Sequence, residues 1–318
     1  MSMLQDLAEY FKPDERAPEY YVKDSNKLFQ QGEKSCVKRL LEKTFNTQIP
    51  CDKFYSIISG EVKEEEKIDT LYSSSLQTLL FFSSISESKP LTYDGVTYSE
   101  VYFEVKNRVI GYPSSVDAVL VGKSKDGKNT VLFIETKLCE VIRDSSPIGK
   151  AEIGKSYSMG SKSNSYCNRF FTDGEDMKAI GIDRNAPDPK SGNYIVSPIG
   201  EAKYVYSYGM KQLLSHIIGI MNFKENGSIN YPMIDRTAEV RFLTLINALP
   251  GYNKSDSEKK TTDFIRHYNV VIEYLRGKPQ CQSITMYNCS TFQDFYSEVK
   301  QSGYNLGEKI VKYYHYEK

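Results

Sequence analysis

The sequence has no long hydrophobic run and no segment that resembles a secretory signal. Its longest apolar pieces, such as TLLFFSSI and IIGIM, are far shorter than the roughly 20 residues that a membrane-spanning helix needs. The first residues, MSMLQDLAEYFKPDER, lack the basic-then-apolar order of a signal peptide. We therefore expect a cytoplasmic protein that has no membrane partner.

The sequence also has no net charge and no closely spaced cysteine pair. Because 41 basic residues balance 41 acidic ones, the overall charge gives no attraction to nucleic acid. Six cysteines show neither a C-x-x-C pair nor zinc-finger spacing, so we expect reduced thiols with structural roles. A zinc ion bound by Cys281 and Cys289 stays open, since their spacing is not diagnostic. From Lys137 to Arg169, basic residues outnumber acidic ones, which predicts a mildly basic loop.

The hydrophobic pattern predicts an α/β protein with a mixed central sheet flanked by helices. We expect a helical N-terminal extension over residues 1–68 and a main domain over residues 69–318. Asp94-Gly95 is typical of a two-residue hairpin turn, and residues 139–200 read as loop-rich. The remaining expected elements are strands over 91–105, 114–138, 238–249 and 282–288, and helices over 69–86, 202–223, 257–277 and in the closing segment.

One stretch, VLFIETK, combines a buried-strand pattern with two charged residues. Glu135 and Lys137 are two positions apart, so in a strand their side chains point to the same face. Asp117 begins the preceding predicted strand, and hairpin pairing of the two strands would bring it beside them. Two converging carboxylates are suitable ligands for a hard cation such as Mg²⁺, and a lysine beside them can stabilise an oxyanion or assist a water. The trio therefore suits metal-assisted hydrolysis of a phosphodiester.

Asp117, followed eighteen residues later by Glu135-Thr136-Lys137, resembles the motif of the PD-(D/E)XK nucleases, which have the restriction-endonuclease-like fold. The resemblance covers roughly residues 70–300 in outline, including the helix SYGMKQLLSHIIGI and the later segments AEVRFLTLINAL and SITMYNCSTFQDFYSEV. In that helix, Gln212 matches a polar residue that often faces the site. One departure is that no proline directly precedes Asp117.

The resemblance implies a Mg²⁺-dependent endonuclease, with Mn²⁺ as a substitute, that acts on double-stranded DNA in restriction or defence. It assigns Asp117 and Glu135 as metal ligands, helped by the Thr136 carbonyl, and Lys137 as the group that activates the water or stabilises the phosphate. Gln212 would position Lys137 or the water. Glu104 is a further candidate ligand. A homodimer and a partner DNA methyltransferase are also expected.

Three alternatives stand beside this interpretation. Asp94 followed by Glu104-Val105-Lys106 is a second match to the motif, although Asp94 suits a turn. GKAEIGKS, residues 149–156, matches the phosphate-loop pattern of nucleotide hydrolases but lacks the strand before it and the helix after it. A nucleic-acid-binding module without catalytic activity is the third. His216, in the apolar stretch LLSHIIGI, is expected to be a core residue.

Overall fold

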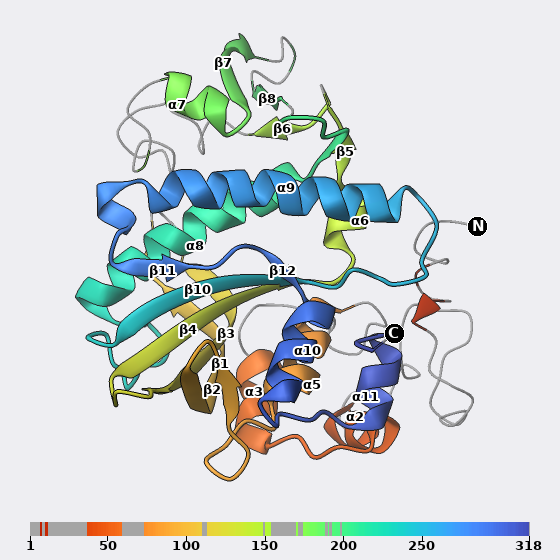
Figure 1. The fold of residues 1–318 in the computed structure, drawn as a ribbon, viewed down its shortest axis with the longest axis vertical. Helices are drawn as coiled ribbons and strands as arrows, with labels where there is room; N and C mark the ends of the chain where they lie inside the picture. Colours follow the sequence, from red (N-terminus) through yellow and green to blue (C-terminus); the bar gives the residue numbers. More distant parts are fainter. Residues whose placement is uncertain are drawn as a thin grey trace.

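The computed structural model describes residues 7, 10, 11, 37–58, 73–109, 113–148, 150–153, 170, 174–187, 190, 193–197 and 199–317. A mixed sheet runs through its centre, with helices on both faces (Figure 1). The expected α/β architecture is therefore confirmed. Among the described helices, none has the length and apolar character needed to cross a membrane.

The main sheet has the strand order β1-β2-β3-β4-β10-β11, and β12 also pairs with β10. The first four strands are antiparallel neighbours, whereas β10 is parallel to β4 and to its other two partners. The expected mixture of antiparallel and parallel pairing is thus present. The strands are β1 (Leu91–Tyr93), β2 (Val96–Asn107), β3 (Ser114–Ser124), β4 (Asn129–Lys137), β10 (Glu239–Ile246), β11 (Ile284–Met286) and β12 (Ser290–Thr291).

Short turns explain why the antiparallel strands pair in sequence order. Asp94 and Gly95 have φ angles of 43° and 73°, so both occupy the left-handed region that a two-residue hairpin turn requires. Tyr93 and Val96 pair directly across this turn. The hairpin predicted at Asp94-Gly95 is confirmed. Gly127, with a φ of 81°, provides the same backbone freedom in the turn between β3 and β4.

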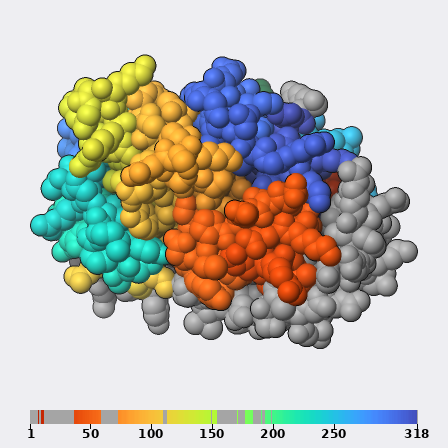
Figure 2. Space-filling view, turned by 90° about the horizontal axis from the view of Figure 1, so that it is seen from below, coloured from red at the N-terminus to blue at the C-terminus, as the bar shows by residue number. Residues whose placement is uncertain are grey.

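One face of the sheet is covered by N-terminal and C-terminal helices. Within the expected helical extension, two helices are described, and their apolar residues belong to the same core as those of the later helices. Figure 2 shows the orange N-terminal segment beside the blue C-terminal segment on this side of the molecule. The helices are α2 (Val37–Phe45), α3 (Cys51–Ile58), α5 (Ser74–Phe82), α10 (Phe292–Gln301) and α11 (Glu308–Tyr313).

The opposite face is covered by two long helices, α8 (Ser207–Asn226) and α9 (Ser257–Arg276) (Figure 1). The helix predicted from residue 202 begins later because Tyr204–Val205 form strand β9, which pairs with β5 (Ser146–Pro147). The segment between β4 and α8 is not wholly irregular. It includes α6 (Glu140–Asp144), α7 (Gly174–Ala179) and a small sheet of β6 (Glu152–Ile153), β7 (Ile182–Pro187) and β8 (Tyr194–Val196).

Strand β3 does not alternate regularly between the two faces. Period-two alternation predicted Ser115, Asp117, Val119 and Val121 on one face. Instead Val116 and Val119 both belong to the core beneath α8 and α9, whereas Ala118 belongs to the core on the α5 side. The alternation therefore changes at Asp117, which lies beside Glu104 of β2, a residue whose φ of 50° interrupts the extended backbone. The face predicted for the start of this strand was wrong.

Candidate active site

The candidate site lies where β3 begins and β4 ends. These strands are antiparallel, and their last paired residues toward this end are Ala118 and Ile134. Asp117 and Glu135 are the next residues beyond that pair. Two carboxylate residues from separate parts of the sequence thus lie at neighbouring strand ends, as the hairpin interpretation predicted.

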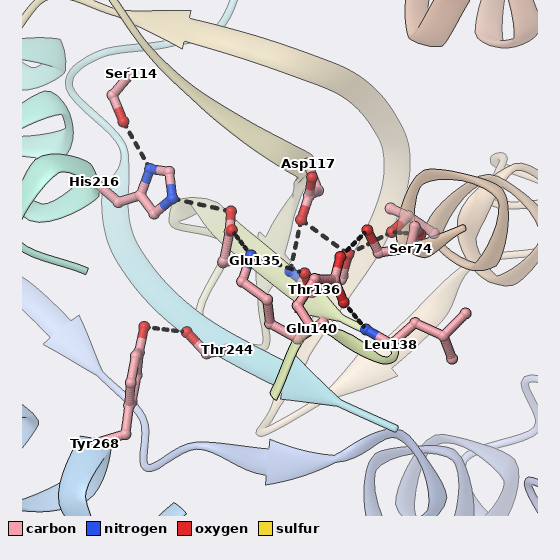
Figure 3. Close-up of polar contacts among 12 residues, drawn as sticks. Ser74, Ser114, Asp117, Glu135, Thr136, Leu138, Glu140, His216, Thr244 and Tyr268 are labelled. Carbon is pink, nitrogen blue, oxygen red and sulfur yellow. Dashed lines mark hydrogen bonds and ion pairs between the residues drawn. The ribbon is translucent and has the colours of Figure 1, made fainter. Parts of the chain in front are cut away.

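The carboxylate of Asp117 is bound by Thr136 (Figure 3). Its Oδ2 accepts hydrogen bonds from the Thr136 backbone N–H at 2.6 Å and from the Thr136 hydroxyl at 2.8 Å. That hydroxyl also lies 2.7 Å from Oγ1 of Thr78 on α5. Burial and the negative charge of Glu135 raise the pKa of Asp117 well above its usual value, although Lys137 opposes the rise. Asp117 is therefore held against the end of β4.

Glu135 and Lys137 form a buried ion pair. Nζ of Lys137 contacts Oε1 of Glu135 and lies 3.2 Å from the Thr136 carbonyl oxygen. Only 3% of Glu135 and 6% of Lys137 is exposed. Burial alone would raise the pKa of Glu135, but Lys137 and His216 lower it to about 2. Burial likewise opposes the charge on Lys137, yet Glu135 and Asp117 raise its pKa well above the usual value. Both partners are charged at neutral pH.

His216 reaches the same carboxylate from helix α8. Its Nε2 lies 3.0 Å from Oε2 of Glu135 as an ion-pair contact, and its Nδ1 lies 2.7 Å from Oγ of Ser114 (Figure 3). The expected burial of His216 is confirmed, but its contact with Glu135 was not predicted. One sequence signal was available, because His216 follows Gln212 by four residues and so shares its helix face.

Gln212 lies on α8 one turn before His216. Its side chain is half-buried, and its Oε1 is buried with no hydrogen-bond partner in the part of the chain that the structure describes. Tyr208, a further turn back, is 54% exposed. Tyr208, Gln212 and His216 thus lie along one face of α8, with Tyr208 exposed to solvent and His216 in contact with Glu135. No hydrogen bond joins Gln212 to Lys137 among the described residues.

Glu104 lies in β2, opposite Asp117 in the register of β2 and β3. Its φ of 50° is in the left-handed region, which is strained for a residue that has a side chain. Ser115 donates a 2.8 Å hydrogen bond to its Oε2, and the Asn230 amide donates one of 2.8 Å to its carbonyl. The carboxylate is buried, and its charge contributes to the raised pKa of Asp117. Glu104 is therefore close enough to influence the site.

Glu140 holds the backbone that leaves β4, a role that the sequence did not indicate. Its Oε2 accepts hydrogen bonds from the N–H groups of Leu138 at 2.8 Å and Cys139 at 3.0 Å. Its Oε1 accepts one of 2.9 Å from the Ser74 hydroxyl on α5 (Figure 3). Through these bonds, Glu140 ties the backbone directly after Lys137 to helix α5.

The rival motif of Asp94, Glu104 and Lys106 is not brought together. Asp94 lies at the β1–β2 turn, where it pairs with Arg241 at 3.0 Å and accepts a 2.6 Å hydrogen bond from Tyr287. Glu104 lies toward the other end of β2, roughly 30 Å away along an extended strand. Asp94 therefore acts as a turn residue, and the later motif remains the better candidate.

The side chains supply the hard oxygen donors that Mg²⁺ prefers, but they do not form a metal-binding cluster in this arrangement. Within the described ranges, no group of three or more His, Cys, Asp or Glu side chains could hold a metal ion. Both oxygens of Glu135 already contact cationic or hydrogen-bonding partners, Lys137 and His216. The donor chemistry of these side chains fits such an ion. Cys281 and Cys289 are free, buried thiols.

The glycine-rich motif GKAEIGKS is described only over residues 150–153. Its Gly149, Gly154, Lys155 and Ser156 lie outside the described residues. Glu152–Ile153, in the middle of the motif, form strand β6 and pair with β8. A phosphate loop needs these positions as an open turn whose N–H groups face the phosphate, so the pairing does not favour the nucleotide-hydrolase alternative.

Comparison of the chain with protein-family models, with curated proteins and with solved structures finds no match.

Proposed function

We propose that the chain is a Mg²⁺-dependent endonuclease that hydrolyses phosphodiester bonds in DNA. The observation that carries the proposal is the adjacency of Asp117, near the start of β3, to Glu135 and Lys137, at the end of the neighbouring strand β4, and the electrostatic interaction among the three. The restriction-endonuclease-like fold is part of the same proposal. It is supported by the chain order of α5, the four antiparallel strands β1–β4, α8 and the parallel strand β10, with α5 and α8 on opposite faces of the sheet.

In this proposal Asp117, Glu135 and the Thr136 carbonyl would hold the metal ion, and Glu104 would supply a further carboxylate. Mg²⁺ or Mn²⁺, when bound, supplies a Lewis acid that neutralises phosphate charge and makes a bound water more acidic. Burial, and after it the negative charge of Glu135, raises the pKa of Asp117 well above its usual value. A divalent cation at this position would favour the charged form of Asp117 and so oppose both effects.

Two other side chains would act on the substrate and the water. Lys137 carries a positive charge that would stabilise the negative charge developing on the phosphate in the transition state. The Oε1 of Gln212, which has no hydrogen-bond partner among the described residues, is an acceptor that can orient a water or the Lys137 ammonium. The ion pair with Glu135 fixes the Lys137 side chain at the end of β4, where this role requires it.

The substrate in this proposal is double-stranded DNA, and the biological setting is restriction or defence. Cutting both strands would be served by a homodimer. A DNA methyltransferase encoded in the neighbouring gene would support a restriction system, because the host DNA would then need protection from the same enzyme.

The proposal predicts a specific dependence on divalent metal. Supercoiled plasmid DNA should be cut in the presence of Mg²⁺ or Mn²⁺ and left intact in EDTA, because hard carboxylate ligands need a hard cation. Ca²⁺ should support DNA binding with little cutting. Agarose-gel analysis of the plasmid and a gel-shift assay of a labelled duplex would measure the two effects.

An Asp117→Asn protein, purified in parallel, is the matched control for contaminating nucleases and should be inactive in Mg²⁺. Full cutting in EDTA would contradict the metal-dependent mechanism. DNA binding without cutting under any metal condition would instead favour the catalytically inactive binding module.

A further inference from the structure

We infer that His216 is a positioning residue that holds the Glu135 carboxylate in place, while Ser114 holds the imidazole from its other side. This inference rests on the proposed function, since it concerns a residue that acts through a metal ligand. His216 itself would contact neither the metal nor the substrate.

Both ring nitrogens of His216 have a close polar neighbour. Nε2 lies 3.0 Å from Glu135 Oε2, and Nδ1 lies 2.7 Å from Ser114 Oγ, with all three side chains at most 5% exposed. Lys137 contacts the other oxygen of Glu135. A glutamate side chain has three rotatable bonds, and contacts on both oxygens restrict it to one orientation. The histidine therefore adds a constraint that Lys137 alone does not provide.

A close approach of α8 to the sheet makes this contact possible. Gly219 lies one turn after His216, and a Cβ atom there would be 3.1 Å from the Asn107 Cβ and 3.5 Å from the Ser114 Cβ. A side chain at position 219 would crowd Asn107 and Ser114. The absence of a side chain thus lets α8 lie close to the sheet, where the imidazole reaches between Ser114 and Glu135.

The two contacts of His216 differ in kind. The contact with Ser114 is a hydrogen bond, whereas Nε2 lies within ion-pair distance of Glu135 Oε2 without meeting hydrogen-bond geometry among the described residues. His216 therefore restrains Glu135 through a close polar contact.

A Ser-His-Glu hydrolase triad is the competing explanation for these three residues. In such a triad the serine meets Nε2 and the acid meets Nδ1, whereas here Ser114 meets Nδ1 and Glu135 meets Nε2. Ser114 is also 5% exposed and so is poorly placed to attack a substrate. The geometry favours a structural hold on Glu135 over nucleophilic catalysis.

Glutamine and asparagine substitutions at position 216 separate the two contacts. The amide nitrogen of glutamine can take the place of Nε2, whereas that of asparagine lies nearer the place of Nδ1. We expect His216→Asn to weaken Mn²⁺ binding by about 10–100-fold, the usual effect of losing a residue that supports a metal ligand, and His216→Gln to restore most of it. Isothermal titration calorimetry with Mn²⁺ measures this without relying on DNA cleavage.

His267→Asn is the matched control. His267 is also buried, but its Nε2 lies 3.0 Å from the Ile180 carbonyl, away from the carboxylates. This variant should lose thermal stability and keep the wild-type affinity for Mn²⁺. Equal Mn²⁺ affinities for His216→Asn and His216→Gln would overturn the positioning role.

Nitrogen-15 NMR of the metal-free protein tests the contacts separately from nuclease activity. Glu135→Gln should shift the Nε2 resonance of His216, and Ser114→Ala should shift the Nδ1 resonance. An Nε2 resonance that does not respond to Glu135→Gln would overturn the inference. A wild-type protein with these NMR responses but no metal-dependent cutting would refute the proposed nuclease function and leave the Glu135–His216 contact established.

Discussion

Replacing Lys137 with alanine is expected to lower the rate of DNA cleavage by about 10²–10³-fold, the usual cost of removing one electrostatic donor from a transition state. Lys137 carries a charged ammonium group at the end of β4. Burial opposes this charge, but the carboxylates of Glu135 and Asp117 raise its pKa and keep it protonated. Single-turnover cleavage of a supercoiled plasmid at saturating Mg²⁺ measures the chemical step directly. Binding of DNA should change far less than the rate.

The buried position of Lys137 requires a second variant, because alanine leaves Glu135 without its main partner. Lys137→Met keeps most of the aliphatic stem and removes only the charge, so it should preserve packing while giving the same loss of rate. Circular dichroism and thermal unfolding confirm that each protein is folded. If a folded Lys137→Met protein cleaved DNA at the wild-type rate, Lys137 would not be the group that stabilises the transition state.

Lys155 provides the comparison with the nucleotide-hydrolase alternative. It belongs to GKAEIGKS and lies outside the described residues. As part of a basic loop, Lys155→Ala should weaken DNA binding modestly and in a salt-dependent manner, with little change in the chemical step. If Lys155→Ala abolished activity, Lys137→Ala retained it and the protein hydrolysed ATP, the phosphate-loop alternative would be correct.

Local patterns in the sequence were sufficient to predict much of the fold. The Asp94-Gly95 turn fixed the β1–β2 hairpin because its backbone geometry depends on those two residues alone. Apolar spacing located α8, α9 and β10 to within a few residues. The separation of Glu135 and Lys137 placed both side chains on one face, since strand periodicity is equally local.

The parts of the site that could not be predicted depend on tertiary packing. The left-handed conformation of Glu104 is supported by Asn230, which is 126 positions away in the sequence, and alternation in β2 and β3 changes beside it. The contact of His216 with Glu135 requires α8 to approach the sheet closely at Gly219. The four-residue spacing of Gln212 and His216 shows that they share a helix face but not how closely α8 approaches the sheet, so the sequence indicated only a buried histidine.

Removing Glu135 is expected to destabilise the fold strongly. Glu135→Ala would leave the Lys137 ammonium buried beside Asp117 without its principal counter-charge, and breaking a buried ion pair from one side usually costs roughly 3–5 kcal/mol. The double variant Glu135→Leu/Lys137→Met removes both charges and fills a similar volume. Such replacements are often neutral or stabilising, so the double variant should be markedly more stable than Glu135→Ala.

The pH dependence of unfolding gives this prediction its sharpest test. The pKa of Glu135 falls from its ordinary value of 4.5 to about 2 in the folded protein. Its stabilising contribution should therefore be complete above pH 4.5 and be lost as the pH falls toward 2. Urea unfolding across this range should show that the free energy of unfolding of the wild-type protein falls as the pH is lowered from 4.5 toward 2. The double variant lacks Glu135, so its free energy of unfolding should not show this contribution, and the wild-type protein should lose stability relative to it. If that difference stayed constant with pH, or if Glu135→Ala were as stable as the double variant, Glu135 and Lys137 would not form the charged buried pair on which the proposed mechanism depends.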